Sequence, residues 1–153
     1  MIIIKIFLGF DHQGVKVKDK IVSYIEENGF EVVLSTLPNS DTDDYPDFAS
    51  DICQKVLNEN GLGILVCGSG IGMSIAANKV NKIKCARVCN GNDAFLAKNH
   101  NGANVIAFSA NLKQEEIESI IDNFLMTKEA SEERHIRRIE KIAKIERENN
   151  GHC

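Results

Sequence analysis

Residues 62–72 read LGILVCGSGIG, an unbroken apolar run that ends in a glycine-rich loop. The run 62–67 is short and rich in branched aliphatic residues, which is typical of a strand that is buried on both faces. Glycines directly after such a strand allow the backbone to turn sharply, and the apolar spacing of 72–80 predicts a helix there. The stretch therefore predicts one strand–loop–helix unit of an α/β protein.

The same alternation extends in both directions along the 153 residues. Pro46 is well placed for the start of a helix, because proline is tolerated in the first turn. Alternation of strands and helices implies a parallel sheet that is covered on both faces, so we expect a single doubly wound α/β domain over 1–153. Strands are predicted at 2–10, 31–35, 62–67, 84–90 and 104–108, and helices at 15–28, 46–57, 72–80, 92–99 and 114–126.

The segment 131–149 departs from this alternation, because it is a heavily charged helix that follows a finished domain. Such a narrow apolar stripe is typical of a helix that packs against a partner subunit. Packing against its own domain would give the same pattern, so both interpretations stay open. The stripe consists of Ile136, Ile139, Ile142, Ala143 and Ile145.

The composition limits the classes of partner. The formal net charge is −4 and the sequence pI is about 5.6, which argues against general binding to nucleic acid or to an anionic membrane. No run approaches the length of a transmembrane helix, and we interpret the apolar N-terminus as a first strand and not as a signal peptide. Five cysteines without a CxxC pair predict free thiols and no zinc site. We expect a cytoplasmic protein without metal or cofactor.

Open parallel sheets bind ligands beyond the carboxyl ends of their strands. We expect three groups there: Asp11 with His12, the loop 67–72, and the segment 98–102. Glycines and a helix N-terminus can direct backbone N–H groups at a phosphate or a developing oxyanion. The loop matches neither the dinucleotide-binding GxGxxG pattern nor the P-loop, so by itself it does not identify a ligand.

Cys67 is the most informative side chain of this set. A thiol at a strand end that faces a helix N-terminus is expected to have thiolate character, so it can act as a nucleophile or as a general base. A buried and inert cysteine is the structural alternative.

The other candidates also have structural alternatives. His12 and His100 can be hydrogen-bonded structural histidines, and Asp11 can be a turn former. Arg134 and Arg138 lie four residues apart, so they can bind an anion together or simply form the solvated face of a helix.

Taken together, these residues resemble the type-B ribose-5-phosphate isomerases, which belong to the ribose/galactose isomerase family. The matching blocks follow the family's order and spacing and cover nearly the whole chain. They are GFDHQG (9–14), DYPDFA (44–49), LVCGSGIGMSIAANK (65–79), KNHNGANVIAF (98–108) and RHIRRIEKI (134–142).

The resemblance implies a flavodoxin-like or Rossmann-like subunit of a homodimer, or of a dimer of dimers. It implies active sites that are shared across the interface, with the C-terminal helix exchanged there. The implied activity is the interconversion of ribose 5-phosphate and ribulose 5-phosphate through an enediolate, in the non-oxidative pentose phosphate pathway.

The resemblance also implies roles for individual residues. Cys67 would be the general base, and Ser69 would relay a proton in place of the threonine of many members. His100, with Asp11 nearby, would open the sugar ring. The binding residues would be Gly68, Gly70 and Gly72 for the enediolate oxygen, Tyr45 and Asn101 for sugar hydroxyls, and His12, Arg134, His135 and Arg138 for the phosphate.

Two departures from the family pattern stand out. Many members have Gly-Ser-Arg after the fifth strand, whereas this chain has Ser109, Ala110 and Asn111, so one phosphate contact is in doubt. The loop 90–93 also differs and can affect which sugar fits. Galactose or allose 6-phosphate isomerisation, a non-catalytic phosphosugar-binding module and a cysteine-dependent acyl transferase remain alternatives.

Overall fold

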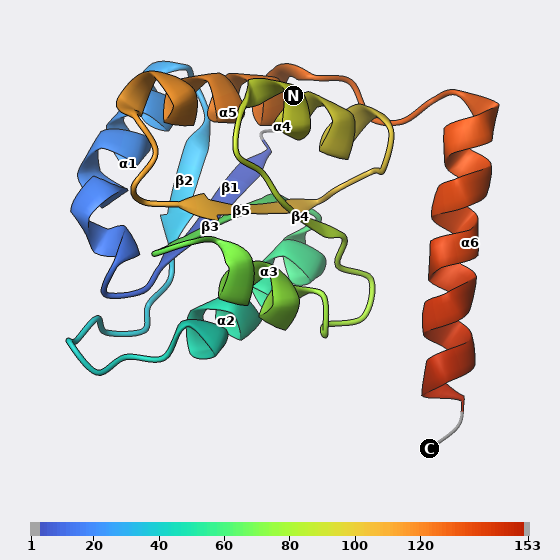
Figure 1. The fold of residues 1–153 in the computed structure, drawn as a ribbon, viewed down its shortest axis with the longest axis horizontal. Helices are drawn as coiled ribbons and strands as arrows, with labels where there is room; N and C mark the ends of the chain where they lie inside the picture. The colour runs from blue at the N-terminus through green and yellow to red at the C-terminus, as the bar shows by residue number, and fades with distance from the viewer. Residues whose placement is uncertain (1–3, 152–153) are drawn as a thin grey trace.

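The computed structural model describes residues 4–151. Its strands form one five-stranded sheet in the order β2-β1-β3-β5-β4, and every neighbouring pair is parallel (Figure 1). This confirms the predicted parallel α/β sheet. The strands are β1 (Lys5–Phe10), β2 (Glu31–Leu34), β3 (Leu62–Cys67), β4 (Cys85–Arg87) and β5 (Val105–Ser109).

Helices cover both faces of the sheet, as the doubly wound prediction requires. In Figure 1, α1, α4 and α5 lie on one face and α2 and α3 on the other. A short 3-10 helix, η1 (Gly14–Val17), precedes α1. The helices are α1 (Lys18–Glu27), α2 (Tyr45–Glu59), α3 (Ile71–Ala77), α4 (Gly91–Asn99), α5 (Gln114–Met126) and α6 (Glu133–Asn150).

The core consists of two apolar layers, one on each face of the sheet. Successive side chains of a strand point to opposite faces, so β3 contributes to both layers. Ile64 and Val66 pack in the layer beneath α1, α4 and α5. Leu65 and Cys67 pack in the layer beneath α2 and α3. The central strand therefore delivers the Cys67 thiol to the face that α2 and α3 cover.

The predicted boundaries agree best in the buried elements. The predictions 62–67 and 114–126 match β3 and α5 to the residue. The predicted strand 84–90 is too long, since β4 spans only Cys85–Arg87 and pairs with β5 alone at the sheet edge. Residues 2 and 3 of the predicted first strand lie outside the described residues.

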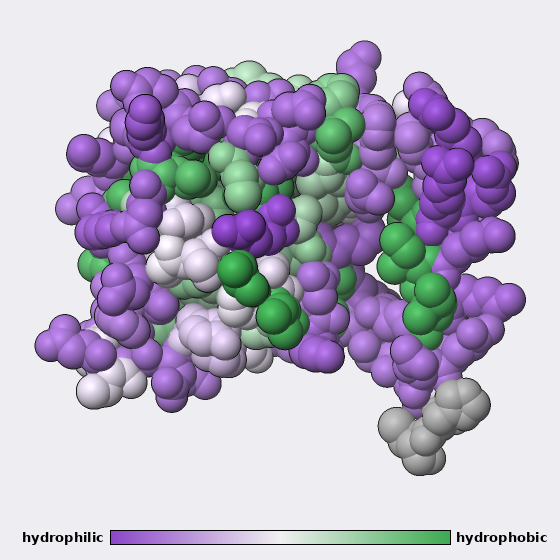
Figure 2. Space-filling view, viewed as in Figure 1, coloured by the Kyte–Doolittle hydropathy of each residue, from purple (hydrophilic) through white to green (hydrophobic). Residues whose placement is uncertain are grey.

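Helix α6 follows an extended connection from α5 and stands at one side of the subunit (Figure 1). His135 is its only buried residue, whereas Ile142 and Ile145 are 48% and 59% exposed. Besides His135, other residues of the helix also contact the domain. Ile139 approaches Gly102, and the Glu146 carboxylate accepts the Lys82 N–H at 3.0 Å. Figure 2 shows the apolar side chains of α6 facing a hollow of about 640 Å³. The chain's own domain therefore leaves most of the α6 stripe uncovered.

Within residues 4–151, no helix combines the length and the apolar character that crossing a membrane would need.

Candidate active site

Cys67 is the last residue of β3 and is only 4% exposed. Its Sγ accepts a hydrogen bond from the Gly70 N–H at 3.1 Å, so the glycine loop curls around the thiol. Gly70 has φ +78°, and a Cβ there would lie 2.8 Å from the Cα of Phe108 in β5. Only glycine accommodates both the left-handed backbone and the close approach of a neighbouring strand. The loop geometry around Cys67 therefore depends on Gly70.

Hydrogen bonds from neighbouring strands hold the carbonyl groups of this loop. The Gly68 carbonyl accepts from Ser109 Oγ at 2.6 Å and from Asn111 Nδ2 at 3.2 Å. The Ser69 carbonyl accepts from Arg87 Nε at 3.0 Å. These contacts set the orientation of the peptide planes, so the loop is organised before any ligand binds. Arg87 has no motif in the sequence that would have identified it.

Ser69 and Tyr45 both lie at the loop. Ser69 is exposed, and its Oγ accepts the Ile71 N–H at 3.2 Å, which leaves its own hydrogen available for donation. Tyr45 is the first residue of α2. A Cβ at Gly72 would lie 2.4 Å from Cζ of Tyr45, so the phenol ring rests directly against the backbone of Gly72. The structure thus brings Tyr45, which lies 22 residues before Cys67 in sequence, to the same edge of the sheet as Cys67.

Asp11 and His12 follow β1 at this edge. Asp11 is buried, and its Oδ1 accepts the N–H groups of Gln13 at 3.0 Å and Gly14 at 2.8 Å, which makes it a turn former. His12 is exposed and donates both its backbone N–H (2.9 Å) and its ring Nδ1 (2.8 Å) to Asp43 Oδ1. The Nδ1 contact leaves the Nε2 atom of His12 for a ligand.

Asp43 has a strongly perturbed carboxyl group. Its burial disfavours ionisation, but hydrogen bonds from His12, Asn39 and Ser40 outweigh that effect and lower the pKa of Asp43 to about 2. The hydrogen bond from Asp43 is in turn the main reason that the pKa of His12 is raised above its ordinary value. Asp43 lies in an acidic polar segment, and the sequence offered no signal to separate it from its neighbours.

Asp11, His12 and Asp43 are the one group of three potential metal ligands found among residues 4–151, with ligand atoms within 4.8 Å of one another. Their hydrogen bonds already explain this proximity. One oxygen of Asp11 binds two backbone N–H groups, and one oxygen of Asp43 binds His12 twice. The arrangement is that of a hydrogen-bonded turn that holds His12 in place.

A second cluster of predicted site residues surrounds the start of α6. The His100 ring stacks on the His135 ring, with centroids 4.1 Å apart and an interplanar angle of 15°. Burial lowers the pKa of His135, and the adjacent His100 and Arg134 lower it further. Arg134 Nε donates to Glu132 Oε2 at 2.9 Å. Arg138 lies one helical turn beyond Arg134 and is exposed.

The prediction that 98–102 lies at the carboxyl edge of the sheet is wrong. Helix α4 starts after the carboxyl end of β4 and returns the chain to the amino end of β5, so His100 and Asn101 lie at the opposite edge from Cys67. Within one chain, His100 is therefore not beside Asp11. The structure divides the predicted site residues into a carboxyl-edge group around Cys67 and an α6 group around His100.

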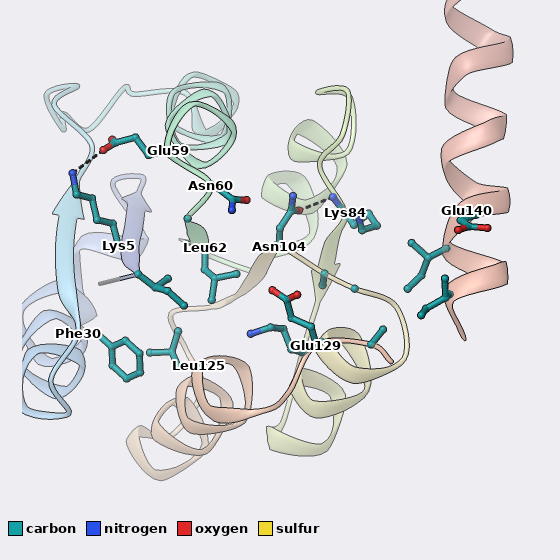
Figure 3. A pocket seen from close by; sticks show the side chains of 18 residues that line it. Lys5, Phe30, Glu59, Asn60, Leu62, Lys84, Asn104, Leu125, Glu129 and Glu140 are labelled. Atoms are coloured by element: carbon teal, nitrogen blue, oxygen red, sulfur yellow. Dashed lines mark hydrogen bonds and ion pairs between the residues drawn. The ribbon is translucent and has the colours of Figure 1, made fainter. Parts of the chain in front are cut away.

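The amino edge also carries a cavity of about 770 Å³ that lies between the strand starts and α6 (Figure 3). Three of its charged residues make structural contacts. Lys5 pairs with Glu59 at 2.7 Å, and the buried Lys98 donates to the Phe124 carbonyl at 2.9 Å. No residue of the carboxyl-edge group lines this cavity, so it is distinct from the site at Cys67.

In open parallel sheets, a loop at the carboxyl edge such as the one around Cys67 is where small ligands bind. The model of the ribose/galactose isomerase family matches residues 6–142. The chain belongs to this family and is an enzyme of the isomerase class.

Individual relatives agree with this assignment over almost the whole chain. The chain is 36% identical to ribose-5-phosphate isomerase B of Escherichia coli, over 95% of this chain and 99% of the relative. A type-B ribose 5-phosphate isomerase structure from Trypanosoma brucei matches with a TM-score of 0.89 and 39% identity, over 94% and 99% of the two chains. A Mycoplasma genitalium ribose-5-phosphate isomerase B structure with bound ribulose-5-phosphate matches with a TM-score of 0.88 and 38% identity, over 95% and 97%.

Proposed function

We propose that this enzyme interconverts ribose 5-phosphate and ribulose 5-phosphate through a cis-enediolate, as a step of the non-oxidative pentose phosphate pathway. The observation that carries the proposal is the Cys67 thiol, enclosed by a hydrogen-bonded glycine loop at the end of the central strand. The names of the similar proteins support the same substrate, and one similar structure contains ribulose-5-phosphate.

Cys67 acts as the general base in this proposal. The open-chain aldose has a carbonyl at C1 and a hydrogen on C2, which that carbonyl acidifies. The Cys67 thiolate removes the C2 proton, and electrons move into a C1–C2 double bond and onto O1. The same sulfur then returns a proton to C1. No atom is lost, and oxidation at C2 balances reduction at C1, so the step requires no external redox partner.

The glycine loop and Ser69 stabilise and protonate the oxygen atoms O1 and O2 of the enediolate. The negative charge that develops on the enediolate needs nearby donors, and the loop through Gly68, Gly70 and Gly72 supplies backbone N–H groups. Ser69 moves a proton from O2 to O1, because its hydroxyl can accept one hydrogen bond while it donates another. Tyr45, which rests on Gly72, is placed to contact a sugar hydroxyl.

We propose that the α6 group completes the site of a second chain. In a homodimer with α6 exchanged at the interface, His100 and Asn101 of one subunit meet Cys67 of the other. His100 opens the furanose ring there, assisted by Asp11, and Asn101 binds a hydroxyl. His12 binds the phosphate together with Arg134, His135 and Arg138. The separation of the two groups within one chain and the exposed apolar stripe of α6 support this arrangement.

The first test is steady-state conversion of ribose 5-phosphate, with allose 6-phosphate and galactose 6-phosphate in parallel. We expect turnover of the pentose phosphate. Turnover of a hexose phosphate alone keeps the mechanism and changes the substrate. Binding of all three sugars without turnover indicates the alternative of another class, a non-catalytic phosphosugar-binding module.

The cellular setting is also part of the proposal. The described cysteines are free, which suits a reducing compartment such as the cytoplasm. The net charge of −4 is consistent with a small-molecule substrate and with the absence of nucleic acid or membrane partners.

A further inference from the structure

Lys16 is connected to the glycine loop through the side chain of Asn111. It lies in η1, and its Nζ donates a hydrogen bond to Oδ1 of Asn111, which is 95 residues away in sequence. Asn111 directly follows β5 and donates its own Nδ2 to the Gly68 carbonyl at 3.2 Å. One asparagine side chain therefore connects the Lys16 ammonium to the loop that encloses Cys67.

The charge of Lys16 is not neutralised by this contact. Its partner is a neutral amide, and no carboxylate within the described part of the chain forms an ion pair with it. His12, another cation-forming group after β1, already faces the Asp43 carboxylate. Arg87 donates a hydrogen bond from its Nε to the Ser69 carbonyl. Lys16 thus places an uncompensated positive charge beside the loop, in a protein with net charge −4.

Asn111 also explains why this ammonium is held near the site. A solvated lysine samples many rotamers, and ordering it costs side-chain entropy. The Asn111 backbone N–H donates to Ser109 Oγ at 3.0 Å, and Ser109 Oγ donates to the Gly68 carbonyl at 2.6 Å. Asn111 is therefore held by the same hydrogen bonds as the loop, and it offers its Oδ1 to the lysine.

We propose that Lys16, positioned by Asn111, binds the phosphate group of the substrate. The inference rests on the proposed function, since it assumes a sugar phosphate whose C1 and C2 lie at Cys67. The phosphate of such a substrate lies several bonds from the reacting carbons. It therefore extends beyond the glycine loop, toward side chains such as Lys16 that lie beside it. A lysine ammonium is suited to binding a phosphate dianion, because it is a compact positive charge on a flexible side chain.

A phosphate contact far from the reacting carbons binds the ground state and the transition state equally. Its loss raises KM and leaves kcat unchanged. For Lys16→Met we expect KM for ribose 5-phosphate and the inhibition constant of inorganic phosphate to rise together, by about 5- to 30-fold, as for a charge-assisted hydrogen bond. The kcat value should change by less than about twofold.

Two further variants control the experiment. Lys20 is an exposed lysine of α1, and Lys20→Met removes the same charge without a contact to Asn111, so both constants should stay at the wild-type values. The double variant K16M/N111R returns a cation to the position that the lysine ammonium occupies. We expect it to recover part of the lost affinity for inorganic phosphate.

The outcomes separate this inference from the proposed function. Unchanged KM and phosphate inhibition in Lys16→Met, or a loss confined to kcat, would overturn the role of Lys16. Equal losses in Lys20→Met would overturn it as well, because the effect would then be one of overall charge. If wild-type protein does not isomerise ribose 5-phosphate, calorimetric titration with inorganic phosphate decides. Binding that weakens in Lys16→Met supports the phosphate contact even though the proposed substrate has failed, whereas unchanged binding removes it.

Discussion

The carboxyl-edge group around Cys67 and the α6 group around His100 are built in different ways. Around Cys67, hydrogen bonds from several strands hold the backbone, and Gly70 packs against β5. Around His100, a ring stack joins it to His135, and ion pairs at the start of α6 hold the exposed side chains of Arg134 and Arg137. The first group is organised by the core of one subunit, whereas the second lies on a helix with an uncovered apolar stripe. The comparison indicates that the proposed catalytic base lies where the subunit's own core holds the backbone, whereas the α6 group lies where that core gives little cover.

Replacement of Cys67 tests the organised group and should have the largest effect. We expect Cys67→Ala to lower kcat by about 10³-fold or more, in line with the loss of a positioned general base. Inorganic phosphate should still bind, because none of the proposed phosphate contacts involves the thiol. Cys89→Ala is the matched control, since Cys89 is exposed and lies outside the site, and it should retain wild-type kinetics. Substantial activity in Cys67→Ala would remove Cys67 as the base.

Mixing two inactive variants tests whether the two groups belong to one site. We expect His100→Ala to reduce turnover of the furanose form by about 10²-fold or more, as a general acid–base residue does. If Cys67 and His100 meet across a dimer, co-refolded Cys67→Ala and His100→Ala chains regain activity. Half of the dimers are mixed and each has one complete site of two, so about a quarter of wild-type activity should return.

The mixture can regain activity only if the site is shared between two chains. Each variant refolded alone is the control and should stay inactive. If the mixture stays as inactive as its components while a size measurement shows mixed dimers, the site lies within one chain. In that case the α6 group would have to reach Cys67 by a rearrangement of its own subunit.

The same division appears in what could be predicted from the sequence. The strand 62–67 and its loop were predictable because contiguous residues define them, and Cys67 stands at their boundary. The segment 98–102 was assigned to the wrong edge, because it was grouped by residue type although a crossover helix returns the chain to the amino edge.

Long-range contacts explain the remaining omissions. Asp43 reaches His12 over 31 residues, and Arg87 reaches Ser69 over 18. Lys16 reaches Asn111 over 95 residues. No local spacing encodes such pairs, since each depends on which strands become neighbours. The local motifs allowed several kinds of chemistry and the family resemblance selected one of them, whereas the residues that position the site required the fold.

Gly70→Ala tests how far the loop depends on backbone packing, with Gly29→Ala as a matched control. Both glycines have positive φ, but a Cβ at Gly29 meets nothing within 4 Å, whereas at Gly70 it meets the β5 backbone. We expect Gly29→Ala to cost about 1 kcal/mol of unfolding free energy from strain alone, and Gly70→Ala to cost about 2–3 kcal/mol. Urea denaturation measures both values.

The two variants should also differ in activity. Gly70→Ala displaces the loop that encloses Cys67, so we expect kcat to fall by about tenfold or more, the range for a lost oxyanion donor. Gly29→Ala lies at the end of α1 and should keep wild-type kcat. Equal stability and activity in the two variants would mean that the approach of Gly70 to Phe108 does not organise the site.

Asp43→Asn should have the smallest effect, because it changes the charge state of His12 and not the reacting atoms. The hydrogen bond from Asp43 raises the pKa of His12, so in the wild type the imidazolium persists to a higher pH than its ordinary value of 6.5 allows. If protonated His12 binds the phosphate, KM stays low up to that raised pKa and then increases as the pH rises through it. Without the carboxylate the pKa falls back, so in Asp43→Asn the increase in KM should begin at a lower pH.

NMR titration of the His12 ring gives the pKa directly, and KM measured across pH 5.5–8.5 (roughly one unit below to two above the usual histidine pKa) shows its consequence. Asp41→Asn is the control, because it removes an exposed acid two residues away that makes no contact with His12. We expect a change in KM of a few fold near neutral pH, as for an exposed charged contact. If His12 titrates at the same pH in both variants, Asp43 does not set its charge. If its pKa falls in Asp43→Asn and KM stays the same, His12 is a structural histidine and the phosphate is bound by other cations.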